Sequence, residues 1–475
     1  MSNALTAAGE VQNSYIKTKT KSIIYRFYAL TCMLTIIISL FGCNKEEIKI
    51  INPIQGASIN LTQTDELTIY LPDWYKEDLQ RAVGYYQSEY PDVNVIVDII
   101  EENYSYPFNY TQRISIELMS GMGPDVVVVP MVMFDDIYKI MDTGAFLNLE
   151  SAINDDVEFR MDDYYQPVLD AGLYKGGRYI IPYCFQLPAM AYNQAVVDRV
   201  GFDILECHNT VSFLDEMVMC LPTLRNNPSF VTSINWYRND LDFMDMSGIV
   251  LINYEEQKTL PDEAAFRVFC DAYKSFYGMD KLTDLEQLNI GGDRSEILHN
   301  GVALFYWVGD GTLPYLSLLG EAKLSEMDIR MTAMPAQDGA INAKVTHGLS
   351  IRSGSTNQRN AWNFIKVVLS EAFQSGSIGG GPQTQFPVNR GALCTTVSNF
   401  TSMNHWSKDG LAYILSQEEV QPVYKMLDAI SSSRLYCIRP LLMFRECMTP
   451  YFISEKSYDE CFAELKSKLT IYMSE

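Results

Sequence analysis

A chain of 475 residues, 47% of them hydrophobic and 20% charged, has the composition of a folded protein and is long enough for two domains. It carries 59 acidic and 36 basic residues, for a net charge of −23. Such a charge argues against binding nucleic acid or an anionic bilayer through the general surface, and it favours a soluble body that acidic polymers repel.

The N-terminal region has the features of a secretory signal. Residues 27–43 read FYALTCMLTIIISLFGC, an uncharged apolar run that follows basic residues at 17, 19, 21 and 26. The run is short for a membrane-spanning helix. Its end, Leu40-Phe41-Gly42-Cys43, resembles the lipobox of bacterial lipoproteins, which implies cleavage before Cys43 and acylation of its thiol. The alternative is an uncleaved anchor helix, and both place the rest of the chain outside the cytoplasm.

We therefore expect a signal peptide over 1–42, and a lipidated Cys43 with a flexible tether over 43–61. The tether shows no clear hydrophobic period and contains Pro53 and Gly56. Without the signal, the chain would have 475 − 42 = 433 residues and a charge of 32 − 58 = −26.

Strand and helix patterns alternate along the next hundred residues. The sequence predicts strands over 66–71, 93–99 and 125–129, and helices over 79–90, 110–120 and 134–143. The third strand, Asp125 followed by four valines, is apolar enough to be covered on both faces of a parallel sheet. This order predicts an open α/β sheet.

Further elements are predicted downstream. An apolar strand covers 302–306, and helices cover 262–277 and the C-terminal residues 458–469. Ser355-Thr356-Asn357 is expected to cap a helix that buries Trp362 in the core.

The order of short segments resembles a known family, the extracellular solute-binding proteins of family 1, which are maltose-binding-protein-like receptors of ABC importers. The segments are YPDVNV (90–95), GPDVV (123–127), GAFLNL (144–149), GRYIIPY (177–183), AYNQ (191–194), HNGVAL (299–304), AMPA (333–336), GLSI (348–351), AWNFIK (361–366) and FPVNR (386–390). Each is weak alone, but together they follow the family order across residues 66–390, with a poor match over 205–290.

The resemblance implies a two-lobed periplasmic-binding-protein-like α/β fold of type II, each lobe an open, mostly parallel sheet flanked by helices. Lobe one would hold 62–187 and 346–386, and lobe two 188–345 and 387–475. The chain would cross between the lobes near 188–193 and near 346–348, where Gly348 would supply hinge freedom.

Sequence signatures of catalysis are absent. The chain has no phosphate-binding G-x-x-x-x-G-K-[ST] loop, no H-E-x-x-H helix, and only near misses to G-x-S-x-G. Its four histidines are far apart and lack a C-x-x-C partner, which makes a metal site improbable. We therefore expect no enzyme activity and no cofactor.

Eight cysteines follow Cys43, at irregular spacings. Buried free thiols are the preferred interpretation, and Cys437–Cys447 is the first disulfide to test.

Ligands of open α/β sheets bind beyond the carboxyl ends of the strands. This rule selects residues after strand one, after strand three and after the strand over 302–306. Aromatic rings can cover the C–H face of a sugar, while carboxylates accept its hydroxyl hydrogens. The candidate ligand-binding residues are Asp73, Trp74, Met131, Tyr192, Trp236, Trp307 and Asp310. Core packing is the alternative for Trp307 and Tyr192.

The resemblance implies a monomeric, lipid-anchored receptor that closes around a carbohydrate, expected to be an oligosaccharide, and delivers it to the permease subunits of an ABC importer. A surface glycan-active enzyme and a ligand-sensing partner of a membrane kinase are the alternative functions. Peptides, polyamines and iron are the alternative ligands.

Overall fold

The computed structural model describes residues 62–474 apart from 63, 103–107, 135–136, 228, 231, 236–239, 280–293, 378–384 and 408. The predicted signal peptide, Cys43 and tether lie outside the described residues. Among the described helices, none combines the length and the apolar character that crossing a bilayer requires.

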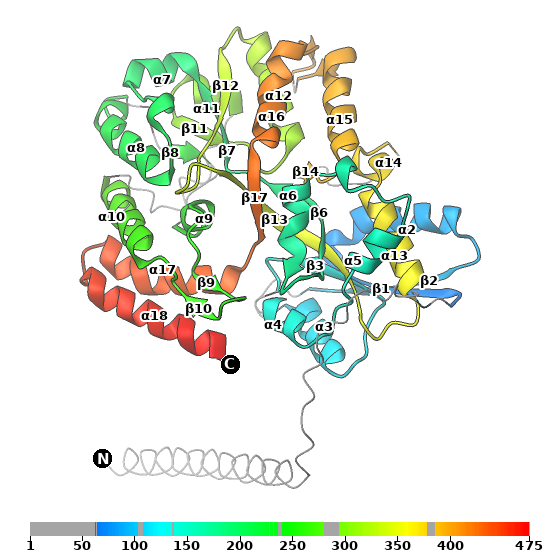
Figure 1. Cartoon of the computed structure of the whole chain (residues 1–475). Coiled ribbons are helices and arrows are strands. Elements are labelled where there is room, and N and C mark those ends of the chain that lie inside the picture. The colour runs from blue at the N-terminus through cyan, green and yellow to red at the C-terminus, as the bar shows by residue number, and fades with distance from the viewer. Residues whose placement is uncertain are drawn as a thin grey trace, which may run out of the picture. The chain divides into compact units, whose positions relative to one another are not determined.

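Seven strands form the larger sheet, in the order β14-β6-β13-β3-β1-β2, with β17 paired to β13 (Figure 1). Their bounds are β1 Glu66–Pro72, β2 Asn94–Ile100, β3 Val126–Pro130, β6 Ile181–Gln186, β13 Ile341–Ile351, β14 Phe386–Pro387 and β17 Ile430–Leu435. The predicted alternation is confirmed, because α2 (Lys76–Glu89) and α3 (Asn109–Met119) separate the first three strands and α4 (Ile137–Asp142) follows them. Every residue of β3 is buried, as its apolar sequence predicts.

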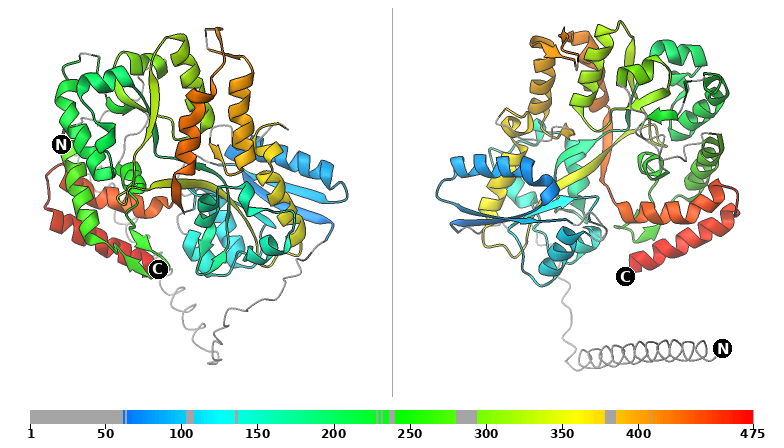
Figure 2. Two further views of the ribbon diagram at one scale, coloured as in Figure 1. Left: turned by 45° about the horizontal axis from the view of Figure 1, so that its top comes forward. Right: turned by 180° about the vertical axis from the view of Figure 1, so that it is seen from behind.

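Helices cover both faces of the larger sheet: α2 and α13 (Gln358–Leu369) lie on one face, and α3 and α4 on the other (Figures 1 and 2). Tyr86 of α2 packs edge-on against Phe364 of α13, with ring centroids 5.8 Å apart. Trp362 is 2% exposed, which confirms its predicted place in the core. The predicted cap is wrong in detail, because the side chain of the N-cap residue Asn357 bonds to Asp125 instead of the helix.

Four strands form the smaller sheet, in the order β12-β7-β11-β8. They are β7 Ala189–Asn193, β8 Thr232–Asn235, β11 Ala303–Trp307 and β12 Ile329–Ala333. Beside this sheet, α10 (Glu263–Met279), α17 (Ile438–Phe452) and α18 (Tyr458–Ser474) share a second apolar core (Figure 1). These positions confirm the strand predicted over 302–306 and the two downstream helices.

The remaining described elements include α-helices of 4 to 15 residues and three short strand pairs. The helices are α5 Glu150–Asp155, α6 Gln166–Leu169, α7 Gln194–Val200, α8 Thr210–Leu224, α9 Asp240–Met246, α11 Arg294–His299, α12 Thr312–Leu324, α14 Glu371–Gln374, α15 Arg390–Ser402 and α16 Gln417–Asp428. Three two-stranded ribbons pair β4 Leu173–Tyr174 with β5 Gly177–Arg178, β9 Ile252–Asn253 with β10 Lys258–Thr259, and β15 His405–Trp406 with β16 Ala412–Tyr413.

The chain passes between the sheets at 187–188, at 334–340 and at 436–437. The first passage lies at the start of the crossing predicted near 188–193. The second was predicted near 346–348 and that position is wrong, because Gly348 lies within β13 and pairs with Val129 and Pro182 of the larger sheet. A Cβ on Gly348 would come within 2.4 Å of Ile180, so this glycine serves close packing. The predicted lobe boundaries remain a proposal.

The direction of the connecting strands determines where the strand ends meet. β7 continues from β6 after two residues and runs antiparallel to β11 and β12. The last residues of β11 and β12, Trp307 and Ala333, therefore lie beside the first residues of β7. Likewise, Pro130 and Gln186, which end β3 and β6, pair with His347 and Lys344 of β13. The carboxyl ends of both sheets thus converge on the connecting segments, where the strand-end rule places a ligand.

Candidate ligand-binding site

Three side chains meet where the two sheets join: Gln186 from the end of β6, Trp307 from the end of β11, and Asp310 from the following turn. We call them the junction cluster. Asp310 Oδ1 accepts hydrogen bonds from Gln186 Nε2 at 2.8 Å and from Trp307 Nε1 at 3.2 Å. The carboxylate therefore links the two sheets. Gln186 is not among the residues predicted from the sequence, because its partner Asp310 is 124 residues away.

Trp307 has features of both predicted alternatives. Its side chain is 5% exposed and belongs to the apolar core of the smaller sheet, yet its indole N–H reaches Asp310. The cavity between Trp307, Gln186 and Arg434 has a volume of about 10 Å³, enough for about one water molecule. A sugar needs a wider opening between the sheets than this arrangement offers.

Asp73 and Trp74 follow β1 in a short 3₁₀ turn, Asp73–Tyr75. The Oδ1 atom of Asp73 is buried and has no hydrogen-bond partner among the described residues. A buried carboxylate oxygen without a donor is costly, so a ligand hydroxyl at this position would be favourable. Trp74 is 38% exposed and packs edge-on against Phe108 with ring centroids 5.4 Å apart, which leaves part of its ring accessible.

The other predicted residues are less accessible. Met131 is fully buried, and its backbone N–H donates to the carbonyl of Thr346 at 2.8 Å. Tyr192 is 6% exposed and packs edge-on against Phe305, which fits the packed alternative, and burial raises its pKa. Trp236 lies outside the described residues.

His347 is a further polar residue at the strand ends, and nothing in the sequence singled it out. Its ring is buried, with Nδ1 2.9 Å from the Thr346 hydroxyl and 3.4 Å from Cys184 Sγ, and with the Tyr75 ring centroid at 4.6 Å. Its Nε2 atom has no partner among the described residues. Burial lowers the pKa of His347 from 6.5 to about 4, because the imidazolium would lose its hydration.

This depressed pKa predicts an acid-sensitive fold. In the unfolded chain His347 takes up a proton near its ordinary pKa of 6.5, whereas the folded protein resists protonation down to about pH 4. Its contribution to stability is therefore complete above pH 6.5 and is lost between pH 6.5 and pH 4, at a cost of about 3 kcal/mol. Urea unfolding across this range should show a shallower pH dependence for His347→Gln than for the parent.

The matched control is His208→Gln, since the His208 side chain is 73% exposed. Equal pH dependence in His347→Gln and the parent would contradict the assignment.

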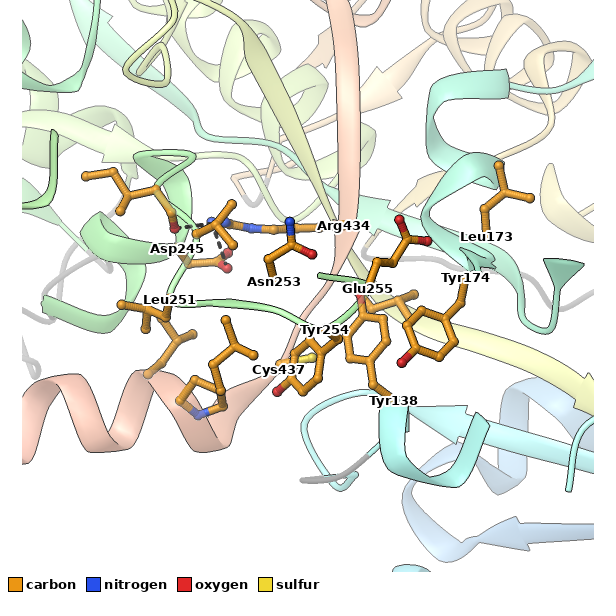
Figure 3. Close-up of a pocket in the computed structure, with 16 residues that line it drawn as sticks. Tyr138, Leu173, Tyr174, Asp245, Leu251, Asn253, Tyr254, Glu255, Arg434 and Cys437 are labelled. Carbon is orange, nitrogen blue, oxygen red and sulfur yellow. Dashed lines mark hydrogen bonds and ion pairs between the residues drawn. The ribbon is translucent and has the colours of Figure 1, made fainter. Parts of the chain in front are cut away.

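A larger cavity, of about 300 Å³, lies beside β17 and the start of α17 (Figure 3). Of the predicted ligand residues that the structure describes, none lines it. Among the described residues, this cavity shares two lining residues with the small cavity beside Trp307: Asp245 and Arg434, which form an ion pair at 3.1 Å.

Within the described residues, no three His, Cys, Asp or Glu side chains are arranged to hold a metal ion. None of the eight cysteines from Cys184 to Cys461, all of which the structure describes, forms a disulfide, so the Cys437–Cys447 bond is not formed.

No protein-family model matches the sequence, and no curated protein matches it. Solved structures do match. The sugar-binding protein MalE from the phytopathogen Xanthomonas citri aligns with a TM-score of 0.63 at 13% identity, over 86% of this chain and 97% of that one. An extracellular solute-binding protein of family 1 from Alicyclobacillus acidocaldarius aligns with a TM-score of 0.57 at 15% identity, over 86% of this chain and 98% of that one. The ABC substrate-binding protein Lmo0181 from Listeria monocytogenes, in complex with cycloalternan, aligns with a TM-score of 0.56 at 13% identity, over 86% and 99%.

These alignments establish the fold. The chain has the two-lobed α/β fold of the MalE-like periplasmic binding proteins, and the predicted fold class is confirmed. The structures it matches include the extracellular solute-binding proteins of family 1 that its sequence segments resemble.

Proposed function

We propose that this protein is the lipid-anchored substrate-binding protein of an ABC importer, which captures a carbohydrate, an oligosaccharide, between its lobes and delivers it to the permease. The observation that carries the proposal is the convergence of strand ends from both sheets on Trp307, Asp310 and Gln186. The matched proteins described as sugar-binding, or solved with cycloalternan, support this ligand class.

The chemistry of the strand ends suits a sugar. Trp74 offers a partly exposed ring for a C–H face, and Asp73 and Asp310 offer carboxylate oxygens for hydroxyl groups. Binding is expected to begin with the lobes apart and to end with the ligand enclosed, because a closed form buries the ring and strengthens each hydrogen bond. The function is binding and transfer without turnover.

A thermal-shift screen against mono- and oligosaccharides tests this function, because a ligand that binds only the folded state raises the melting temperature by mass action. We expect at least one oligosaccharide to raise it, and calorimetry to give saturable binding with no product in the recovered sugar. A hydrolysed product would support the glycan-active enzyme, and a panel without any shift would contradict a sugar ligand.

Trp307→Ala should weaken the binding of the identified sugar at least tenfold, or about 1.4 kcal/mol, since it removes both a ring and the N–H that orients Asp310. Calorimetry on the folded variant measures the change. Trp406→Ala is the matched control, because that side chain is 66% exposed on β15. Unchanged affinity in Trp307→Ala, with folding intact by circular dichroism, would remove Trp307 from the site.

Cys43→Ala should block both cleavage and acylation, because a lipoprotein signal requires the thiol at the cleavage position; the variant should keep residues 27–42, whereas the parent should begin at an acylated Cys43. Fractionation and mass spectrometry of the N-terminal peptide measure the outcome. A parent that stays embedded with residues 27–42 attached would instead identify an uncleaved anchor helix.

A further inference from the structure

The cavity of about 300 Å³ is built from four separate parts of the chain (Figure 3). Tyr138 of α4 and Tyr174 of β4 come from the side of the larger sheet, and residues 245–255 come from the side of the smaller sheet. Arg434 to Leu441, where β17 leads into α17, complete the lining. A volume of this size is at the lower end for ligand pockets, which points to a small molecule.

One wall of the cavity is aromatic. Tyr254 stacks on Tyr138, with ring centroids 4.3 Å apart and planes inclined by 17°, and Tyr174 meets Tyr138 edge-on at 5.2 Å. Burial raises the pKa of Tyr138 and Tyr254, so both remain neutral phenols. Leu251 and Leu441 supply apolar surface nearby, and both are at most 6% exposed. This wall suits the flat face of an aromatic ring.

The charged groups of the lining leave one negative charge unbalanced. Arg434 is paired with Asp245 at 3.1 Å, so these two charges cancel. Glu255 lies above the tyrosines in Figure 3, and its Oε1 accepts a hydrogen bond from the backbone N–H of Lys175 at 2.8 Å. Among the described residues, no cationic side chain forms an ion pair with Glu255. The lining therefore carries two carboxylates and one guanidinium.

We propose that this cavity is a second ligand site, for a small aromatic amine whose ring lies against the tyrosines and whose ammonium group meets the Glu255 carboxylate. An ammonium group that lies near both a tyrosine face and an unpaired carboxylate is attracted by each of them, which strengthens its binding. The net charge of −23 also raises the local concentration of small cations. Arg434, the one cation among the described lining residues, already faces Asp245, so an anion entering the cavity would meet the Glu255 carboxylate.

Tyramine is the probe, with calorimetry on the purified full chain. We expect saturable binding of one tyramine, and binding at least tenfold weaker to Glu255→Gln. This variant keeps the oxygen that accepts from Lys175 and sits on an exposed residue, so it should fold normally. The matched control is Glu256→Gln, because Glu256 is the exposed neighbour, pairs with Lys258 at 2.9 Å and does not line the cavity. Its affinity for tyramine should equal that of the parent.

Two ligand analogues sharpen the test. 2-Phenylethanol keeps the ring without the charge and should bind more weakly than tyramine, while phenylacetate should show no binding. Equal affinity of Glu255→Gln and the parent, or phenylacetate binding as tightly as tyramine, would overturn the proposal.

The proposals for the sugar site and for the amine site can be disproved independently. Trp307 does not line this cavity, so Trp307→Ala should retain tyramine binding even where it loses sugar binding. Loss of tyramine binding in Trp307→Ala would place the amine at the junction cluster and overturn the second site.

Discussion

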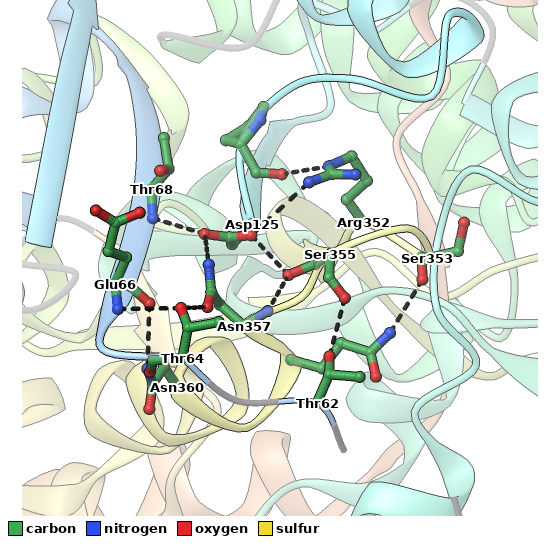
Figure 4. A network of polar contacts seen from close by, with 12 residues as sticks. Thr62, Thr64, Glu66, Thr68, Asp125, Arg352, Ser353, Ser355, Asn357 and Asn360 are labelled. Carbon is green, nitrogen blue, oxygen red and sulfur yellow. Dashed lines mark hydrogen bonds and ion pairs between the residues drawn. The ribbon is translucent and has the colours of Figure 1, made fainter. Parts of the chain in front are cut away.

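Asp125→Ala is expected to lower the free energy of unfolding by about 4 kcal/mol, the largest effect of any single side-chain truncation we consider. Asp125 is 4% exposed and lies between Thr68 of β1 and the turn before α13 that contains Ser355 and Asn357 (Figure 4). Its Oδ2 accepts from the backbone N–H of Thr68 at 2.8 Å and from Asn357 Nδ2 at 3.0 Å, and its Oδ1 accepts from Ser355 Oγ at 2.6 Å. Alanine would remove the acceptor of all three donors, of which the Ser355 and Asn357 groups are buried and the Thr68 N–H is partly buried.

Urea unfolding followed by circular dichroism measures this loss. The free energy of unfolding of Asp125→Asn should lie between those of Asp125→Ala and the parent. The amide keeps one oxygen acceptor but turns an N–H₂ group toward a donor. Asp92→Ala is the matched control, since Asp92 is exposed in the turn before β2. A loss for Asp125→Ala no greater than that for Asp92→Ala would show that the carboxylate does not hold these segments together.

The same network shows which parts of the fold local sequence could predict. The alternation of β1, α2, β2, α3 and β3 follows from hydrophobic period and from Gly and Pro breaks, which lie within each segment. The prediction of a cap at Asn357 failed because its side-chain amide donates a hydrogen bond to Asp125, 232 residues away, and no local pattern contains that partner. The crossing near Gly348 failed for a related reason, since β13 joins β17, β3 and β6, all distant in sequence.

The candidate site was predictable to the same extent. The rule of strand ends selected Asp73 and Trp74, which follow β1, and Trp307 and Asp310, at and after the end of β11; their role as ligand residues stays a prediction. It could not select Gln186 or His347, because their polar roles depend on which strand pairs with which. It also could not foresee the cavity beside β17, whose walls come from segments up to 303 residues apart in the numbering, Tyr138 to Leu441.

Gly309→Ala should lower the free energy of unfolding by about 3 kcal/mol and should also abolish tight sugar binding. A Cβ on Gly309 would lie 1.8 Å from the carbonyl oxygen of Leu187 and 2.4 Å from the Trp307 ring. The first contact is with backbone, at the passage from β6 to β7, and cannot be relieved by a rotamer change. The Gly309 carbonyl also accepts from the Leu187 N–H at 2.9 Å, so any displacement breaks this bond and moves Trp307 away from Asp310.

Gly84→Ala is the matched control for this substitution. Gly84 lies within α2, and a Cβ there would meet nothing within 4 Å. Alanine should therefore stabilise that helix by about 0.5 to 1 kcal/mol without changing sugar affinity. Thermal unfolding and calorimetry of both variants separate the effects. If Gly309→Ala melted and bound sugar like the parent, the close approach at Leu187 would not constrain the junction, and the junction cluster would lose its role as the base of the ligand site.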